Sequence, residues 1–290
     1  MSFPSNNNTD INSELFANFV ADAQYAMYES SVARNLVRTF TVPMNAGKVV
    51  QVPVWSSISA EVIADEAAAT AKTTNTTSPT ITLKEHVVFN QITDMLRDSA
   101  YGDVMMDLAN QSGLAIGESL DSMVFGEFEN FSSDLGSTST ELTTTLILKA
   151  AATLRAAKVQ GPYFAVVHPN AAYALKNALT GTLPYSGATG ISALSPVGGQ
   201  IQVTGVIGSI GGVTVIESPL VAAVTTGGAT AYRGGVFAGS AIGLAERGAI
   251  EMETQRQAAA RATDLVLKAV AGAAVIRSTH GVALTCEGTL

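Results

Sequence analysis

The side chains that most often carry catalysis or bind metals are few and scattered in this sequence. The histidines are His86, His168 and His280, and Cys286 is the only cysteine. A zinc site needs several such ligands at short spacings, and a histidine general base needs a partner that orients it. Neither pattern is found here. His168 precedes Pro169 at the end of an expected strand, where a structural hydrogen bond is the better interpretation. We therefore expect no catalytic residue, no metal site and no cofactor.

Sequence motifs of common enzymes are also missing. The chain has no Gly-x-x-x-x-Gly-Lys-Ser/Thr loop, no Gly-x-Ser-x-Gly elbow and no His-Glu-x-x-His pair. Gly205, Gly208 and Gly211 have a three-residue spacing that favours close strand packing over dinucleotide binding. We predict that the chain is not an enzyme. The alternative is an α+β enzyme with an unrecognised site, which a monomer that binds a small ligand would favour.

Composition predicts a large core and a surface that other proteins cover. The chain has 290 residues, enough for one large domain or two medium ones without a disulfide or metal. Hydrophobic residues make up 47% of it, but charged residues only 14%, about half the usual share for a free domain. One cysteine allows no intrachain disulfide, which suits a reducing cytoplasm.

Neither a membrane nor a nucleic acid is the expected partner for this surface. Glu217, Pro219 and Arg233 interrupt the longest apolar stretch, and the N-terminus lacks the basic start and apolar core of a secretory signal. The formal net charge of -8 disfavours a dedicated nucleic-acid binder, which needs clustered Lys and Arg. The charge is compatible with a protein that encloses DNA without binding it tightly.

The first third of the chain predicts a helix followed by a long hairpin. Residues 14–37 carry apolar side chains at helical spacing, and from Lys48 the period changes to two, with Val50, Val52 and Val54 on one side of a strand. Residues 81–90 alternate in the same way, and the Thr- and Ala-rich stretch 65–80 lies between the two strands. An isolated hairpin is marginally stable, so this arm needs a neighbour to lie on.

A long amphipathic helix is predicted over residues 98–128. Its apolar stripe includes Leu108, Ala115, Ile116 and Met123, and its polar face includes Glu118 and Asp121. Glycine in a helix interior costs about 1 kcal/mol relative to alanine, so glycines in this helix suggest the close approach of another element. These glycines are Gly102, Gly113 and Gly117.

The second half predicts a mixture of helices and strands, which makes the fold class α+β. A helix over 146–157 ends at Gly161-Pro162, a buried strand covers 163–167, and Pro169 opens a helix through Leu179. A hairpin is expected at Gly211-Gly212. Further strands are expected at 249–253, 264–270 and 274–279, followed by a short tail, although the Ala-rich residues 255–262 favour a helix.

In this order the elements resemble the tailed-phage major capsid proteins of the Hong Kong 97 fold, which encapsulins share. Residues 164–169, Phe-Ala-Val-Val-His-Pro, look like the strand that enters the family's A-domain. Residues 208–218 look like its turn in which a Gly-Gly pair precedes a Val-rich strand. Residues 239–247, followed by Glu251, Glu253 and Arg256, resemble its return into the P-domain.

The resemblance implies a division of the chain into named parts. Residues 1–47 would be the N-terminal arm, 48–90 the E-loop, 98–128 the spine helix, 91–133 and 246–290 the P-domain with its β-sheet, and 134–245 the A-domain. No scaffold-type leader precedes the arm in this sequence, so the resemblance implies a subunit that is already processed or that uses a separate scaffold.

The function implied is that of a major capsid protein that self-assembles into pentamers and hexamers of an icosahedral shell around double-stranded DNA. The DNA would be contacted non-specifically, and no membrane would be involved. A scaffolding protein, a portal and a cement or decoration protein are the expected partners, with assembly in the bacterial host cytoplasm and a final place in the virion. The alternative is an encapsulin-like compartment that holds a cargo enzyme.

Several residues are candidates for contacts between subunits. The namesake of the fold links an E-loop lysine to an asparagine of a neighbour, which draws attention to Lys72 and Lys84, although a solvated or salt-bridging lysine is the simpler interpretation. Two interpretations of Asp65 and Glu66 stay open. They either form a solvated face of the loop, or they pair with basic residues of an adjacent subunit, such as Arg34 or Arg38. Trp55, on the first strand of the arm, is a further contact candidate.

Overall fold

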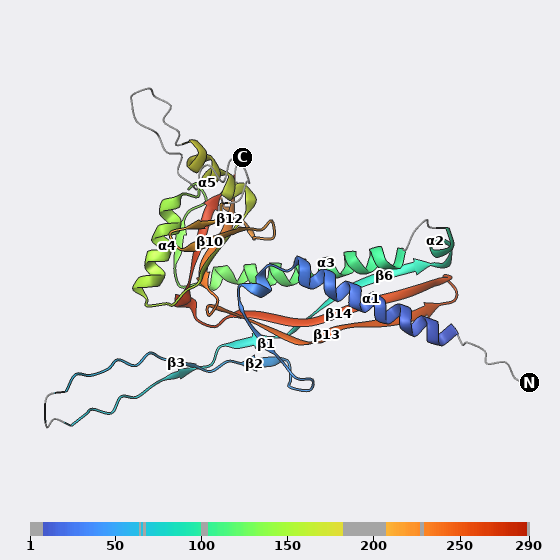
Figure 1. Cartoon of the computed structure of the whole chain (residues 1–290), viewed down its shortest axis with the longest axis horizontal. Coiled ribbons are helices and arrows are strands. Elements are labelled where there is room, and N and C mark those ends of the chain that lie inside the picture. Colours follow the sequence, from blue (N-terminus) through green and yellow to red (C-terminus); the bar gives the residue numbers. More distant parts are fainter. Residues whose placement is uncertain are drawn as a thin grey trace, which may run out of the picture.

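The structure is a computed structural model that describes residues 8–63, 65, 68–99, 104–181, 207–226 and 229–288. Figure 1 shows an elongated sheet with two long helices lying along it, a second sheet with two shorter helices, and a slender arm. None of the helices in these residues is long and apolar enough to cross a membrane.

Two helices form the layer that covers the elongated sheet. Helix α1 spans Asn8–Ser30 and ends before the 3-10 turn η1 (Ala33–Asn35), and α3 spans Val104–Gly126 and continues into η2 (Glu127–Asn130). Phe19, Ala23 and Met27 of α1 are buried in one core cluster with Ile116 and Leu120 of α3. Helix α1 is therefore part of this core rather than a free arm.

The helical segment predicted over 98–128 differs from the observed one in two ways. The short helix α2 (Asp94–Ser99) precedes α3, and residues 100–103 between them, with Gly102, lie outside the described residues. Ala115, predicted on the apolar stripe, is exposed, while Asp121, predicted on the polar face, is buried. The stripe is displaced because α1 and the sheet cover α3 from two sides, which a single helical period does not indicate.

The elongated sheet has the strand order β1-β13-β14-β6. Its strands are β1 (Arg38–Thr41), β13 (Ile242–Gln257), β14 (Ala262–Val275) and β6 (Lys84–Thr93). The pair β13–β14 is a long antiparallel hairpin in which Gln257 opposes Ala262. The Ala-rich residues 255–262 therefore form the end of this hairpin and not a helix, because pairing along both strands outweighs a local preference.

The second sheet has the order β7-β15-β12-β8-β10-β9, with β11 paired to β12. These strands are β7 (Asp134–Gly136), β8 (Tyr163–Val167), β9 (Ser209–Ile210), β10 (Val213–Glu217), β11 (Ala223–Thr226), β12 (Ala229–Ala238) and β15 (Gly281–Glu287). Helices α4 (Thr144–Ala156) and α5 (Pro169–Gly181) lie beside it in Figure 1. The predicted elements at 146–157, 163–167 and 169–179 are confirmed, as is the hairpin at Gly211-Gly212, where both glycines have positive φ.

The C-terminal segment departs from the sequence interpretation. Residues 274–279 were predicted as a strand, but β14 ends at Val275 and the 3-10 turn η3 (Ser278–His280) follows. Residues 281–287, predicted as a tail within the P-domain segment, form β15 between β7 and β12 of the second sheet. Both faces of β15 are buried, so its residues do not alternate between apolar and polar. A search for the alternation typical of a half-exposed strand therefore misses it.

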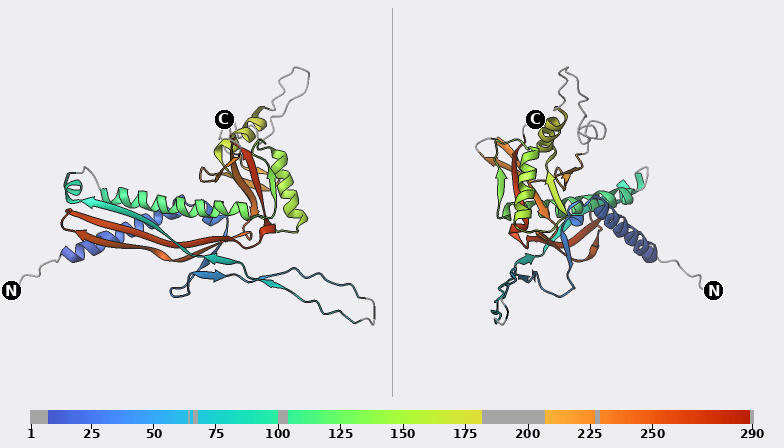
Figure 2. Two further views of the ribbon diagram at one scale, coloured as in Figure 1. Left: turned by 180° about the vertical axis from the view of Figure 1, so that it is seen from behind. Right: turned by 60° about the vertical axis from the view of Figure 1, so that its left-hand side comes forward.

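The arm consists of two short strand pairs. β2 (Val49–Gln51) pairs with β5 (Thr80–Thr82), and farther out β3 (Val54–Trp55) pairs with β4 (Thr76–Thr77), both antiparallel. The predicted hairpin is confirmed, but its return strand joins the elongated sheet at Lys84, earlier than the boundary at residue 90. Figure 2 shows the arm projecting beyond both larger sheets in each view.

Candidate inter-subunit surfaces

The arm exposes apolar side chains on a backbone that its own chain barely covers. Trp55 is 62% exposed, Ile58 65% and Val62 100%. Beyond the last strand pair, the bonds that hold the two sides together are polar: Ser56 N donates to Asn75 O at 3.0 Å, and Lys72 Nζ to Ser59 Oγ at 3.4 Å. With so little apolar burial, the outer arm has no stabilising face within its own subunit.

The base of the arm, in contrast, is firmly anchored. Val42, Val52, Ile81 and Leu83 form a separate buried cluster with Ala245 of β13. Gly272 of β14 lies against this base, where any Cβ would overlap with the carbonyl oxygen of Thr82. A fixed base directs the outer arm away from the body, as Figure 1 shows.

The second surface is the face of the elongated sheet that α1 and α3 do not cover. On β6, His86, Val88 and Asn90 point to α3, with Asn90 Nδ2 bonded to Ser112 Oγ at 2.7 Å, while Val87 and Phe89 point away and are 53% and 59% exposed. Apolar side chains on both faces of an edge strand suggest that a neighbouring molecule covers the outer face.

A charged group lies on the strands beside these residues. Lys268 Nζ of β14 is 3.1 Å from Glu251 and 2.9 Å from Glu253 of β13. The hydrogen bonds that Lys268 donates to the carboxylates of Glu253 and Glu251 raise the pKa of Lys268, and the bond to Glu253 lowers the pKa of that carboxyl. This exposed face therefore combines apolar residues with a group that carries one excess negative charge.

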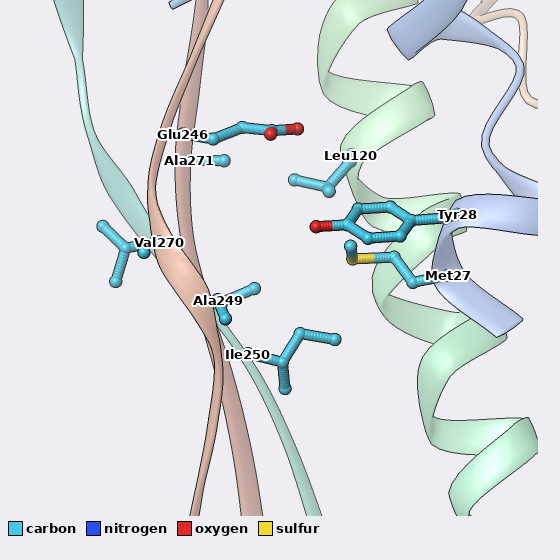
Figure 3. Close-up of a pocket in the computed structure, with 10 residues that line it drawn as sticks. Met27, Tyr28, Leu120, Glu246, Ala249, Ile250, Val270 and Ala271 are labelled. Carbon is cyan, nitrogen blue, oxygen red and sulfur yellow. The ribbon is translucent and has the colours of Figure 1, made fainter. Parts of the chain in front are cut away.

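On the opposite side of the sheet, the helices close the structure. Figure 3 shows Tyr28 and Met27 of α1 and Leu120 of α3 pointing toward Glu246, Ala249 and Ile250 of β13. The cavity between them has a volume of about 20 Å³, room for one water molecule. This space is too small for a ligand, so the helix layer serves as core.

Asp121 is the most informative residue that the sequence interpretation placed wrongly. Its carboxylate accepts hydrogen bonds from Ser31 Oγ at 2.6 Å, from Val32 N at 2.8 Å and from Ala33 N at 3.2 Å. These groups lie directly after α1, so the carboxylate ties the end of α1 to α3. The partners are about 90 positions away in the chain, and no local pattern indicates them.

The predicted contact residues differ in how the structure places them. Arg34 forms an ion pair with Glu246 of its own chain at 2.9 Å, and its pairing with Asp65 or Glu66 of an adjacent subunit stays a prediction. Arg38 is exposed and lies over the ring of Phe40, 5.0 Å from its centroid. Trp55, Asp65, Lys72 and Lys84 are exposed, and Glu66 lies outside the described residues.

The histidines and the cysteine lie at separate places, and no group of potential metal ligands is found in the described part of the chain. His86 Nδ1 shares a hydrogen bond with Ser119 Oγ at 2.7 Å, and His280 Nδ1 shares one with Ser240 Oγ at 2.8 Å. Burial is the main cause that lowers the pKa of His86, His168 and His280. Each has a structural partner, as expected for His168, whose Nδ1 accepts from Asn170 N.

Burial, and secondly the nearby carboxylate of Asp134, raises the pKa of Cys286 to about 12. The thiol therefore stays protonated and unreactive near neutral pH.

Comparison with known proteins agrees with this geometry. Residues 77–284 match the model of a family described as phage capsid protein, and no curated protein matches the chain. A structure from Mycobacterium phage Che8 is similar at 19% identity, covering 82% of this chain and 84% of that one, with a TM-score of 0.62. The capsid of the cyanophage P-SCSP1u shares 16% identity over 89% of each chain, with a TM-score of 0.65. The capsid of Ralstonia phage GP4 shares 11% identity over 88% of this chain and 87% of that one, with a TM-score of 0.66. At such identities the solved structures establish the shared fold.

Proposed function

Because the chain belongs to the phage capsid protein family and has an α+β fold of the Hong Kong 97 type, we propose that it is the major capsid protein of a tailed phage and builds a closed shell from copies of itself. Membership of this family fits a structural role. The hydrogen bonds of His86, His168 and His280 to groups of their own chain are compatible with that role.

The arm is the observation that carries this proposal. Its base is fixed in the core, while its outer part exposes Trp55, Ile58 and Val62 and lies free of both sheets in Figure 1. Large apolar side chains on a strand pair that lacks a covered face are typical of a surface that a partner completes. In a shell, the partner is an adjoining copy of the same chain.

Such an arm suits the geometry of a closed shell. Each copy offers its arm and receives the arm of another copy on a different surface, which is a heterologous contact that closes into rings. We infer rings of five and six that together form an icosahedral shell. A contact of this kind buries about 1,600 Å² in a standard stable interface, much of whose gain is offset by ordering and desolvation.

The contents and partners of the shell are inferred from charge and from the function itself. A chain with net charge -8 gives a wall to which DNA binds weakly, so we infer that packaged double-stranded DNA is contacted non-specifically. A scaffolding protein, a portal and a cement protein would complete the particle. Assembly would take place in the host cytoplasm, and the mature protein would be part of the virion.

Shortening the arm tests the proposal. Replacing residues 57–74 with Asn-Gly joins Ser56 to Asn75 through a two-residue turn at the point where their backbones already bond. Because the anchored base stays intact, we expect a soluble subunit whose circular dichroism spectrum and melting temperature match the parent. Negative-stain electron microscopy should show no closed particles.

The control for this experiment keeps the length of the arm. A chain with Thr73→Ser and Thr74→Ser should assemble like the parent, since Thr73 is exposed, Thr74 is half-buried and both changes remove only a methyl group. Closed particles from the shortened chain would contradict the proposal. Mass spectrometry of parent particles adds a second readout, because an enzyme enclosed as cargo would instead support an encapsulin-like compartment.

A further inference from the structure

A groove lies where three connections of the chain meet, and none of the helices and strands that the structure describes fills it. The residues between α1 and β1, the turn from α4 to β8 and the turn from β12 to β13 surround a volume of about 350 Å³. Pro162, which is exposed, and Phe164, which is half-buried, supply apolar surface, and Gln160 and Ser240 supply polar surface, whereas Leu36 and Val37 lie buried beneath them. The volume is within the range of about 300 to 1,000 Å³ typical of sites that bind a ligand the size of a few residues.

Among the described residues that line this groove, Arg38 alone is charged. It is exposed, and its contact with the ring of Phe40 leaves the guanidinium edges open. Among the residues that the structure describes, Arg38 takes part in none of the ion pairs, whereas Arg34 is already bonded to Glu246. A planar guanidinium at the edge of an apolar groove suits a carboxylate that flanks apolar residues.

The tip of the arm has this chemistry. Val62 is 100% exposed and Ile63 41%, and the carboxylates of Glu61 and Asp65 lie on either side of them, both exposed. Val62 is thirteen residues beyond Val49 at the arm's base, and an extended strand spans about 3.3 Å per residue, so the tip reaches roughly 40 Å from the base. This length is sufficient to extend across to another copy.

We propose that the tip of the arm of one subunit binds in this groove of an adjoining subunit, with Val62 and Ile63 on Pro162 and Phe164, and with Glu61 or Asp65 paired to Arg38. The proposal rests on the shell function proposed above and names the place where the arm ends. The open face of the elongated sheet, with Val87 and Phe89, would then receive another part of the assembly.

Cysteine cross-linking in assembled particles distinguishes the two surfaces. One variant carries Val62→Cys and Gln160→Cys, which pairs the tip with the groove. The matched variant carries Val62→Cys and Phe89→Cys, which pairs the tip with the open sheet face. All three parent residues are exposed, and Cys286 does not compete because it is buried with a pKa of about 12. A disulfide forms only between Cα atoms roughly 4.4 to 6.8 Å apart.

After mild oxidation, we expect the first variant to give a ladder of linked subunits on a non-reducing gel and the second to stay monomeric. A ladder from the second variant alone, or from neither variant in particles that electron microscopy shows to be closed, would overturn the groove assignment and leave the shell function intact. A parent chain that forms no particles, alone or with its scaffold, would count against both.

A charge exchange tests the ion pair independently. Arg38→Glu and Glu61→Arg should each raise the protein concentration needed for assembly by roughly tenfold, and the double variant should restore it to near the parent value. Because both side chains are exposed, the melting temperature of the unassembled subunit serves as the control for folding. If Asp65 is the partner, Asp65→Arg restores assembly with Arg38→Glu. Single variants that assemble like the parent, or the absence of rescue by both Glu61→Arg and Asp65→Arg, would contradict the pairing.

Discussion

At the scale of single residues, buried polar groups show how the helix layer is fixed. Asp121 is 2% exposed, and its carboxylate accepts bonds from a hydroxyl and two backbone N–H groups that follow α1. Buried or half-buried donors need an acceptor, and the carboxylate supplies one for all three groups. A single side chain thereby joins two segments far apart in the sequence.

Substituting Asp121 should therefore destabilise the subunit. Asp121→Ala leaves three buried donors without an acceptor, and we expect the free energy of unfolding to fall by about 3 kcal/mol or more. Urea unfolding of the unassembled subunit measures the change. Glu118→Ala is the matched control, because Glu118 is exposed on the same helix and its loss should change stability by less than about 0.5 kcal/mol. Equal effects of the two substitutions would show that the Asp121 bonds contribute little.

At the scale of elements, the crossing of α1 over α3 depends on small residues. A Cβ at Gly113 would overlap with the backbone of Ala23, and one at Gly117 would overlap with Ser30. The sequence prediction that glycines in this helix mark a close approach is confirmed for these two positions. The gain from packing two long helices at short distance offsets the conformational cost of glycine in a helix.

Alanine at these positions separates packing from helix propensity. Gly113→Ala should lower the melting temperature of the subunit because the backbone of α1 must shift, at a cost of about 1 to 3 kcal/mol. Gly126→Ala, at the end of the same helix, has nothing within 4 Å of the new Cβ, and its backbone is helical. We expect this control to be neutral or to stabilise the subunit by about 0.4 to 1 kcal/mol. If Gly113→Ala were stabilising as well, α1 would not pack as described.

At the scale of the whole molecule, the subunit combines a well-packed body with surfaces that need other copies. One buried cluster joins α1, α3 and the elongated sheet to one face of the second sheet, another lies between the other face of the second sheet and α4 and α5, and a third fixes the base of the arm. The exposed apolar residues include those of the arm and of the open sheet face, which are separate regions in Figure 1. Identical chains can close into a shell when each binds one of its surfaces to a different surface of the next copy, and two such separate regions are present here.

The only tryptophan reports on assembly, since Trp55 lies on the arm and is 62% exposed in the subunit. When arms lie on neighbours, the indole leaves water, and we expect its fluorescence emission to shift to shorter wavelength as particles form. The shortened chain described above retains Trp55 and should show no shift under the same conditions. Emission that stays unchanged while light scattering reports closed particles would mean that this part of the arm remains in water.

The sequence by itself determined most of the local structure and the class of the protein. Period-two alternation identified the arm, a helical period identified α3 and α4, and Gly211-Gly212 identified a turn. These features depend on residues close together in the chain, so local propensity and pattern suffice to predict them. Their order also led to the resemblance that the family match and the solved structures support.

Only the tertiary structure decided which faces are buried and which charges are free. Asp121 was predicted on a polar face, but α1 covers it, and Glu246 of a distant strand pairs with Arg34. The return strand of the arm joins the elongated sheet at Lys84. β15 pairs with β12 in the second sheet, although β13 and β14 of the elongated sheet lie between these two strands in the chain. Burial and pairing depend on which distant segments meet in space, and no spacing along one segment contains that information.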